Sequence, residues 1–477
     1  MAKSIAHASV VGEPIPAPAF SFQVMNCFSP SRCSVLLLCG ILSVLSPAAI
    51  AQTSRNQSEA KPLDELAAGG PLWEMSQDAF EAKYKPLGLQ WLSQAKDEAR
   101  FFGNYNLWNG EIPVTETLVE FQNGKVFRIS FSIFNRGDNS DRFASRKDFE
   151  KKVDDDRDII TKHLAVQPKD RGRDATSAVK AYGLLWTKLP EMYLLEWSYQ
   201  KENPAMRQEF RPEFIRLRLA QMPKPASLLS GDTATGNQPV LKASLTANVT
   251  HEENGDVVIK NVPMVDQGPK GYCAVATAER VFKYYGVPVD QNEMAQVANT
   301  KEGGGTSPTE MFKALTVLEA RLHVKVRAIT KWDFAEFSRM IDSYNREAKH
   351  DKKKEVSLAR HGNTIDIGEI YSEFDPDALK TALTVKNKAN FSKFQRTVEG
   401  MIDRGVPLMW GVELGLYKET KTPQVMGGHM RLIIGYNTKT NELLYSDSWG
   451  EAHALKRMPI DNAFAMTTGL YYMEPLK

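Results

Sequence analysis

Apolar residues between positions 115 and 219 recur at every second position in several segments, the period of a half-buried strand. In 125–134, for example, Phe127, Ile129 and Phe131 alternate with polar residues. Asn123-Gly124 separates this segment from 115–122, and the dipeptide favours the tight turn of a hairpin. The same reasoning predicts further strands at 182–187, 192–199 and 214–219.

Other segments of this region have a helical period. Phe149, Val153, Ile160 and Leu164 recur at helical spacing on a charged background, and Ser76 can cap a short helix upstream. Strands and helices together predict a small α+β domain with an antiparallel sheet over residues 71–222. Nothing in this domain points to catalysis, so its role stays open.

The second half of the chain predicts a helix, a buried strand and a late hairpin. An alanine-rich helix is expected from residue 273 to 285, where Gly286 stops it. A buried strand is expected at 406–414, and strands at 427–436 and 442–450 flank a polar turn. Residues 331–400 form an insertion with helical segments and no motif; a solvated surface elaboration is favoured over a lid.

Composition narrows the function classes. The chain has 477 residues, 42% of them hydrophobic, which indicates a globular protein of two or three domains. Lys and Arg number 60 and Asp and Glu number 58, so no basic excess suggests a nucleic-acid partner.

The amino-terminal segment predicts export. A short apolar run at 35–44 follows Arg32 and precedes Ala49-Ile50-Ala51, as in a secretory signal peptide cleaved after Ala51. We therefore expect a leader and signal peptide at 1–51, a flexible lead-in at 52–70, and a secreted or periplasmic protein without a stable membrane span. A retained anchor is the alternative, and either Met1 or Met25 can be the start.

Cleavage there would change the cysteine count. Cys27, Cys33 and Cys39 lie in the leader, so Cys273 alone would remain and no intramolecular disulfide could form. Cys273 begins the predicted helix, where the helix dipole and free N–H groups favour a thiolate. The alternative is an ordinary buried cysteine. Gln267, six residues earlier, could stabilise an oxyanion together with the Cys273 backbone N–H.

The late hairpin supplies a histidine and a carboxylate. If its turn centres on Lys439, Asp447 faces Arg431, and His429 lies one diagonal step away on the same sheet face. The carboxylate could then orient the imidazole. A register slip of one residue would separate the two, and Asn437 is the fallback orienting residue.

The segments DQGPKGYCAVA, GGHMRLIIGYN and YSDSWG resemble the papain-like cysteine peptidases, closest to their bacteriocin-processing-like branch. The resemblance implies a papain-like α+β fold for 262–477. The polar stretch before it, with little apolar periodicity, predicts a linker at 223–261 that can end in one strand. It implies Cys273 as nucleophile, His429 as general base and then acid, Asp447 as orienting group and Gln267 as oxyanion-hole donor. It implies a peptide or protein substrate and neither a metal nor an organic cofactor.

Three functions stay open on this reading. The first is an exported thiol hydrolase that cleaves amide bonds through an acyl-enzyme. The others are a catalytically silent binding module and an acyl transferase or cross-linking enzyme on the same fold. The sequence decides neither the oligomeric state nor whether residues 71–222 are removed as a pro-region.

Overall fold

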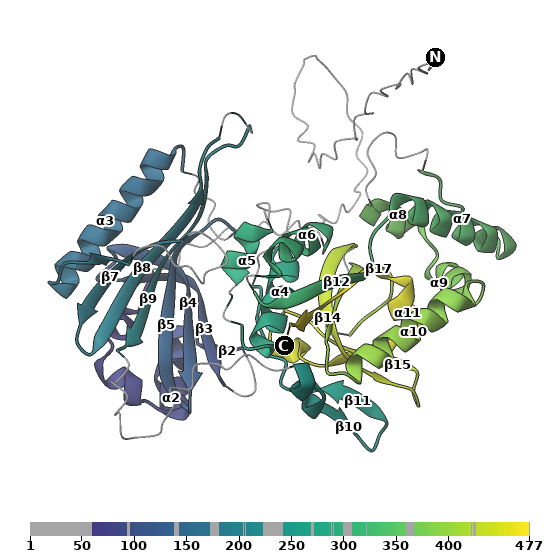
Figure 1. The fold of residues 1–477 in the computed structure, drawn as a ribbon, viewed down its shortest axis with the longest axis horizontal. Helices are drawn as coiled ribbons and strands as arrows, with labels where there is room; N and C mark the ends of the chain where they lie inside the picture. Colours follow the sequence, from purple (N-terminus) through teal and green to yellow (C-terminus); the bar gives the residue numbers. More distant parts are fainter. Residues whose placement is uncertain are drawn as a thin grey trace, which may run out of the picture.

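The computed structural model describes residues 60–476 except for the gaps 93–95, 138–142, 172–180, 204, 206, 223–241, 269–270, 288, 290, 299–307, 321, 359–366, 421 and 423–425. The described residues form two sheets, each with a large hydrophobic core (Figure 1). Helices occur with mainly antiparallel strands, so the α+β prediction is confirmed. We call each sheet with its packed helices the first and the second domain. The predicted leader and signal peptide at 1–51 lies outside the described residues.

The first sheet has the order β1-β3-β4-β5-β9-β8-β7-β6, with β2 paired to β3. Neighbours are antiparallel except β1 and β3. Its strands are β1 (Lys61–Pro62), β2 (Gln90–Trp91), β3 (Glu98–Leu107), β4 (Ile112–Gln122), β5 (Lys125–Asn135), β6 (Lys169–Asp170), β7 (Tyr182–Lys188), β8 (Glu191–Gln200) and β9 (Arg211–Gln221).

One face of this sheet carries the first core. Three helices contribute buried residues to it, α1 (Asp64–Ala68), α2 (Gln77–Tyr84) and α3 (Arg146–Leu164). All four apolar positions predicted on α3 are buried, because their spacing places them on one stripe of the helix. The Ser145 hydroxyl caps α3 by accepting a hydrogen bond from Asp148 N at 3.2 Å.

The predicted hairpin is present as β4 and β5. Gln122 pairs with Lys125, and Asn123 and Gly124 both have positive φ, as the tight turn requires. The strict alternation predicted for 125–134 is broken at Phe127, whose residue is 48% exposed. The register shifts at this point, so Phe127 is an extra residue in a bulge and turns out of the core.

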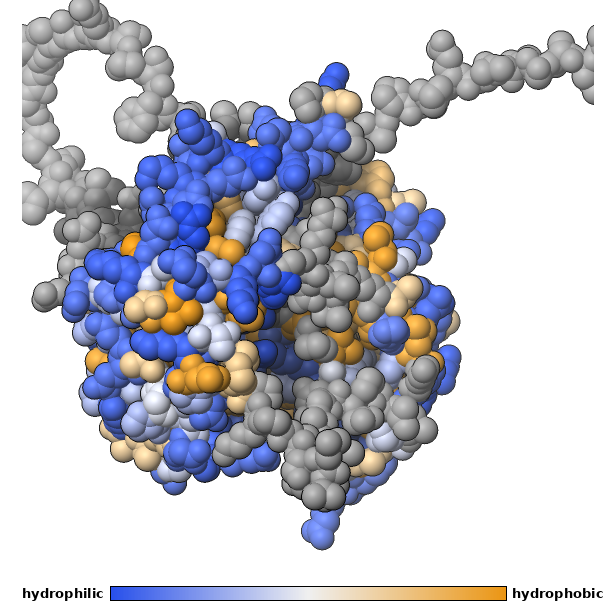
Figure 2. Space-filling view, turned by 60° about the vertical axis from the view of Figure 1, so that its left-hand side comes forward, coloured by the Kyte–Doolittle hydropathy of each residue, from blue (hydrophilic) through white to orange (hydrophobic). Residues whose placement is uncertain are grey.

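The opposite face of the first sheet is polar. It carries charged side chains that are nevertheless buried, among them Arg100, Glu116, Glu196 and Arg216. Burial of charge requires partners, and here Arg216 Nε donates to Glu196 at 2.9 Å. The side of the molecule shown in Figure 2 is mostly hydrophilic, and its hydrophobic residues form separate spots.

The second sheet has the order β10-β11-β14-β13-β17-β12, and β15 pairs with both β14 and β16. β13 lies between β14 and β17, and all seven of its residues are buried, as expected for 406–414. The strands are β10 (Val249–His251), β11 (Asp256–Ile259), β12 (Val324–Thr330), β13 (Leu408–Leu414), β14 (Gly427–Asn437), β15 (Glu442–Ser446), β16 (Lys456–Pro459) and β17 (Thr467–Pro475).

Helices α4 (Cys273–Tyr284) and α5 (Gln291–Val297) lie on the side of the second domain that faces the first domain (Figure 1). The insertion forms α7 (Phe334–His350), α8 (Ile367–Glu373), α9 (Pro376–Thr384) and α10 (Lys388–Ile402). Of these, α7, α8 and α9 lie on the far side of the second domain from the first (Figure 1). The remaining helices are α6 (Pro308–Leu318) and α11 (Ile460–Ala465).

The predicted lead-in and the predicted linker both contain regular elements. In the lead-in, β1 pairs with β3, and Leu63 and Leu66 are buried in the first core. In the linker, β11 pairs with β14, so residues 256–259 belong to the second sheet. The physical reason is apolar content, because the run Val257, Val258 and Ile259 is buried within a segment that is otherwise polar.

In the part of the chain that the structure describes, no helix combines the length and apolar character needed to cross a bilayer.

Candidate active site

Cys273 is the first residue of α4 and is half-buried. Ten of the twelve residues of α4 are buried, which fixes the helix in the second core. Thr277 Oγ1 donates to the Met430 carbonyl at 3.3 Å, so α4 is tied to β14 next to His429. The helix position predicted for Cys273 is therefore the observed one, with the N-terminal dipole at the thiol.

The hairpin that carries the histidine is β14 with β15. Near the turn, Tyr436 pairs with Leu443, one residue away from the predicted register. The register then shifts at Ile434, and Ile433 pairs with Tyr445, as predicted. A bulge at Ile434 therefore holds one extra residue between the turn and His429. The predicted register is observed from Ile433 toward His429, and not between the bulge and the turn.

His429 and Asp447 meet on this hairpin. His429 Nε2 lies 2.6 Å from Asp447 Oδ1, and both side chains are buried. Because Nε2 contacts the carboxylate, the other ring nitrogen, Nδ1, is the one that can hydrogen-bond to the Cys273 thiol. Trp449 stacks on the imidazole with ring centroids 4.4 Å apart, which adds to the burial of His429.

The pKa values of the thiol and the imidazole shift in opposite directions. Burial lowers the pKa of His429, but the charge of Asp447 and its hydrogen bond outweigh burial and raise this pKa to about 9. Burial raises the pKa of the Cys273 thiol, but hydrogen bonding and the charge of His429 bring it below its ordinary value. Both shifts favour a thiolate–imidazolium pair at neutral pH.

Asp447 has partners besides His429. Arg431 Nε donates to Asp447 Oδ2 at 2.8 Å, and the Ser448 N–H donates to Oδ1 at 2.8 Å. Burial raises the pKa of Asp447, but the positive charges of His429 and Arg431 lower it to about 2. The carboxylate is therefore ionised at neutral pH.

Arg431 is a residue of the site that the sequence did not single out for a role. Its side chain is fully buried, and Nη1 donates to Glu419 Oε2 at 2.9 Å while Nε holds Asp447. The Tyr445 hydroxyl also donates to Glu419. A buried arginine needs a carboxylate partner, and because Asp447 also pairs with His429, Glu419 supplies the second negative charge. The sequence held one signal for this role, because Arg431 is a charged residue in an apolar strand and lies opposite Asp447 in the predicted register.

Arg280 connects α4, the helix that begins at Cys273, to the hairpin. From α4, it donates to the Pro263 carbonyl at 2.8 Å, the Asp447 carbonyl at 3.1 Å and Ser446 Oγ at 2.5 Å. Burial lowers the pKa of this guanidinium to about 10. Arg280 thus holds three segments of the site together, and its helical position alone gave no indication of this.

Gln267 is buried on the loop that leads into α4. Ser448 Oγ donates to Gln267 Oε1 at 2.7 Å, and Gln267 N donates to the Ser448 carbonyl at 2.9 Å. The Ser448 hydroxyl thereby fixes the orientation of the amide, in which the NH₂ group is the donor end. Gln267 is thereby placed beside the residue that follows Asp447.

The other histidine and amide near the site have different partners. His453 packs edge-on against Trp449 with ring centroids 5.6 Å apart, and its carbonyl accepts from Asp447 N at 2.9 Å. Asn437, the fallback orienting residue, donates from Nδ2 to Asp256 at 2.7 Å and lies at the hairpin turn. Asn437 therefore joins the end of β14 to the start of β11.

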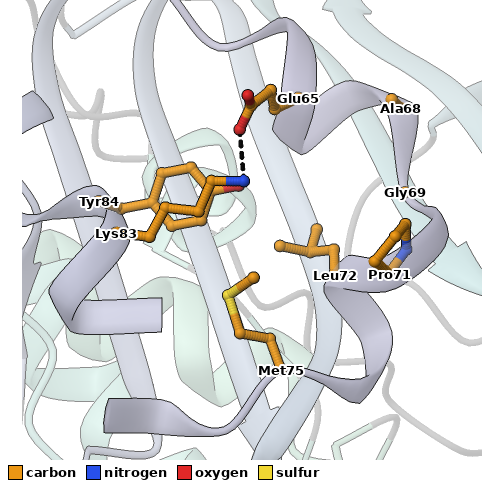
Figure 3. A pocket seen from close by; sticks show the side chains of 8 residues that line it. All are labelled: Glu65, Ala68, Gly69, Pro71, Leu72, Met75, Lys83 and Tyr84. Carbon is orange, nitrogen blue, oxygen red and sulfur yellow. Dashed lines mark ion pairs between the residues drawn. The ribbon is translucent and has the colours of Figure 1, made fainter. Parts of the chain in front are cut away.

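Two further features lie away from these residues. Figure 3 shows a pocket in the first domain whose lining is mostly apolar; at its rim Lys83 Nζ pairs with Glu65 at 2.6 Å. Among the described residues, one group offers three potential metal ligands, and it lies at the end of α7 (Glu347, His350 and Asp351).

Comparison with known proteins agrees with this geometry. Residues 259–472, somewhat under half of the chain, match the family described as Peptidase_C39 like. A search of curated proteins gave no match. Among solved structures, the chain is similar to xylellain, a cysteine protease from Xylella fastidiosa, with 12% identity and a TM-score of 0.21 over 54% of this chain and 95% of that one.

The start of the match at residue 259, on the last residue of β11, fits a second domain that includes the late part of the predicted linker. The second domain carries a half-buried cysteine at a helix start and a buried histidine–carboxylate pair in an α+β fold. Residues 259–472 thus match the Peptidase_C39 like family, and this match supports a papain-like cysteine peptidase.

Proposed function

We propose that the protein is an exported thiol hydrolase that cleaves peptide bonds through Cys273, His429 and Asp447, with Gln267 in the oxyanion hole. The 2.6 Å contact between His429 Nε2 and Asp447, on a hairpin tied to the Cys273 helix, carries this proposal. The pKa shifts of Cys273 and His429 support it because they favour the charged pair. Export rests on the apolar run at 35–44 and the Ala51 cleavage site.

In the proposed reaction the Cys273 thiolate attacks the carbonyl carbon of a peptide bond, and a C–S bond forms. The negative charge moves to the carbonyl oxygen, where the Gln267 NH₂ and the Cys273 N–H would donate to it. The C–N bond breaks as His429 gives its proton to the leaving amine. Water then attacks the acyl-enzyme, His429 takes the water's proton, and the C–S bond breaks to release the acid.

Alkylation of Cys273 tests the charged pair without needing a substrate. Iodoacetamide at mildly acidic pH should label Cys273 far faster than a free thiol, and His429→Ala should remove the difference. His453→Ala is the matched control, because His453 contacts the same Trp449 without bonding the Asp447 side chain. Equal rates for the wild type and a free thiol would overturn the proposal and favour a silent binding module.

A peptide-library digest with the mature chain tests turnover, with Cys273→Ala as the control. Hydrolysed peptides that disappear with Cys273→Ala are the expected result. Fast alkylation without hydrolysis, but with products when amines are added, would assign acyl transfer in place of hydrolysis.

A further inference from the structure

The loop before Cys273 is held by the first domain. Arg100 lies on β3, on the polar face of the first sheet, and Asp266 lies immediately before Gln267. Arg100 Nη2 donates to Asp266 Oδ2 at 2.8 Å, and Arg100 Nη1 donates to the Asp266 carbonyl at 3.2 Å. One guanidinium therefore fixes both the side chain and the backbone of the residue next to Gln267.

This contact is buried and closes a turn around Gln267. The Arg100 side chain is 6% exposed and that of Asp266 is 17% exposed. The second oxygen of Asp266, Oδ1, accepts from Gly268 N at 2.8 Å, and Gly268 has a positive φ of 64°. Glu116 of β4 lies 3.8 Å from Arg100 and adds a second carboxylate beside it. Gln267 is thus bracketed by Asp266 and Gly268, whose geometry depends on Arg100.

The first domain also contacts the other end of the loop and α4. The Tyr272 hydroxyl donates to Asn135 Oδ1 at 3.2 Å, at the end of β5. A Cβ at Gly137 would collide with the Tyr272 ring, so the chain approaches it closely. Lys283 of α4 donates to Glu98 of β3 at 3.0 Å. The loop and the helix that it begins are therefore anchored on the same sheet.

We propose that the first domain is a positioning element of the active site. Through Arg100 and Asp266 it holds the Gln267 amide where the oxyanion would form, so the active protein retains this domain and does not lose it as a pro-region. A donor held in place before the reaction stabilises developing charge without a cost of reorganisation. The inference rests on the proposed function, because it requires Gln267 to act in turnover.

Steady-state kinetics test this inference on the full mature chain, with the peptide cleaved best in the library as substrate. Arg100→Gln should lower kcat about ten- to a hundredfold and leave KM within about threefold, because an oxyanion contact acts in the transition state. Arg100→Lys, which keeps the charge with fewer donors, should recover part of the loss. Glu98→Gln is the matched control, since it removes the other ion pair of β3 with the second domain and does not touch Asp266.

A double-mutant cycle separates positioning from general damage. If Arg100 acts through Gln267, adding Arg100→Gln to Gln267→Ala should cause little further loss of kcat. The rate of Cys273 alkylation should stay unchanged in Arg100→Gln, because the charged pair does not need the oxyanion hole. If Arg100→Gln does not fold, Asp266→Asn tests the same contact from the other side.

Two results would overturn the inference: losses in Arg100→Gln no larger than in Glu98→Gln, or fully additive losses with Gln267→Ala. Both require an active wild type. A wild-type chain without fast alkylation or cleavage would instead contradict the proposed function itself.

Discussion

Replacing Asp447 by Asn removes one charge from the centre of the site and changes its shape little. The carboxylate is fully buried and accepts hydrogen bonds from His429, Arg431 and Ser448. Asn can still accept from His429 Nε2, so the orientation of the ring can persist. What the variant loses is the negative charge, and the consequence should appear in the ionisation of His429.

The structure sets the size of that change. The charge of Asp447 and its hydrogen bond are the leading causes that raise the pKa of His429 to about 9, against burial that lowers it. Without the charge, burial lowers this pKa while the hydrogen bond and charge of Cys273 still raise it, so the pKa should fall from about 9 toward its ordinary value of 6.5. At pH 7.5 the imidazolium would then drop from nearly all molecules toward about one tenth.

The pH profile of Cys273 alkylation at fixed iodoacetamide concentration measures this. The wild type should keep its thiolate–imidazolium pair up to about pH 9, where His429 loses its proton. Iodoacetamide reacts with the thiolate, so in Asp447→Asn, where a weaker imidazolium no longer stabilises the thiolate, the onset of alkylation should move to higher pH. Asp377→Asn, at a side chain that is 90% exposed, is the matched control. An unchanged onset of alkylation in Asp447→Asn would refute the reasoning.

Asp447 should also make stability depend on pH. Its folded pKa of about 2 lies below the ordinary value of 3.8, so its ionisation contributes about 2 kcal/mol above pH 4, which is lost as the pH falls toward 2. Urea unfolding of the wild type should show this acid loss, and Asp447→Asn should not. Equal acid slopes in the two proteins would contradict the assignment.

Three further predictions follow from the contacts of the site and the sheet. Gln267→Ala should lower kcat about a hundred- to a thousandfold while Cys273 alkylation keeps its rate; an equal fall in both would argue for a structural role. Arg431→Met leaves two buried carboxylates without their shared cation and should lower the free energy of unfolding in urea by about 3–5 kcal/mol, whereas a loss under about 1 kcal/mol would contradict the burial argument. Gly435→Ala would place a Cβ 2.5 Å from the Val257 carbonyl oxygen, so β11 must move, and urea unfolding should show a loss of about 1–3 kcal/mol. No measurable change there would mean that β11 is not firmly paired.

Local signals in the sequence predicted much of the fold. The helical spacing of α3, the Asn123-Gly124 turn and the apolar run of β13 each lie within one element, so neighbouring residues determine them. The start of α4 at Cys273 belongs with these, because the break before it and the alanines after it are adjacent in sequence.

The sequence could not reveal contacts between distant segments. Glu419 and Arg431 pair across a loop, and the partners of Arg280 come from two separate segments. The polar face of the first sheet also gave no indication that it contacts the loop before Cys273. The sequence therefore did not predict a role for Arg100. The bulge at Ile434 is a similar case, since nothing local in a run of apolar residues marks the position where an extra residue fits.

The hydrogen bonds of Arg280 have a consequence for how the second domain opens. One buried guanidinium joins α4 to the backbone and side chain at the end of β15, so neither segment can separate without leaving buried polar groups unpaired. Helix α4 and the hairpin of β14 and β15 should therefore unfold together as one cooperative unit. In native-state hydrogen exchange, the amides of α4 and β14 should share one opening free energy, and Arg280→Met should lower it for both alike.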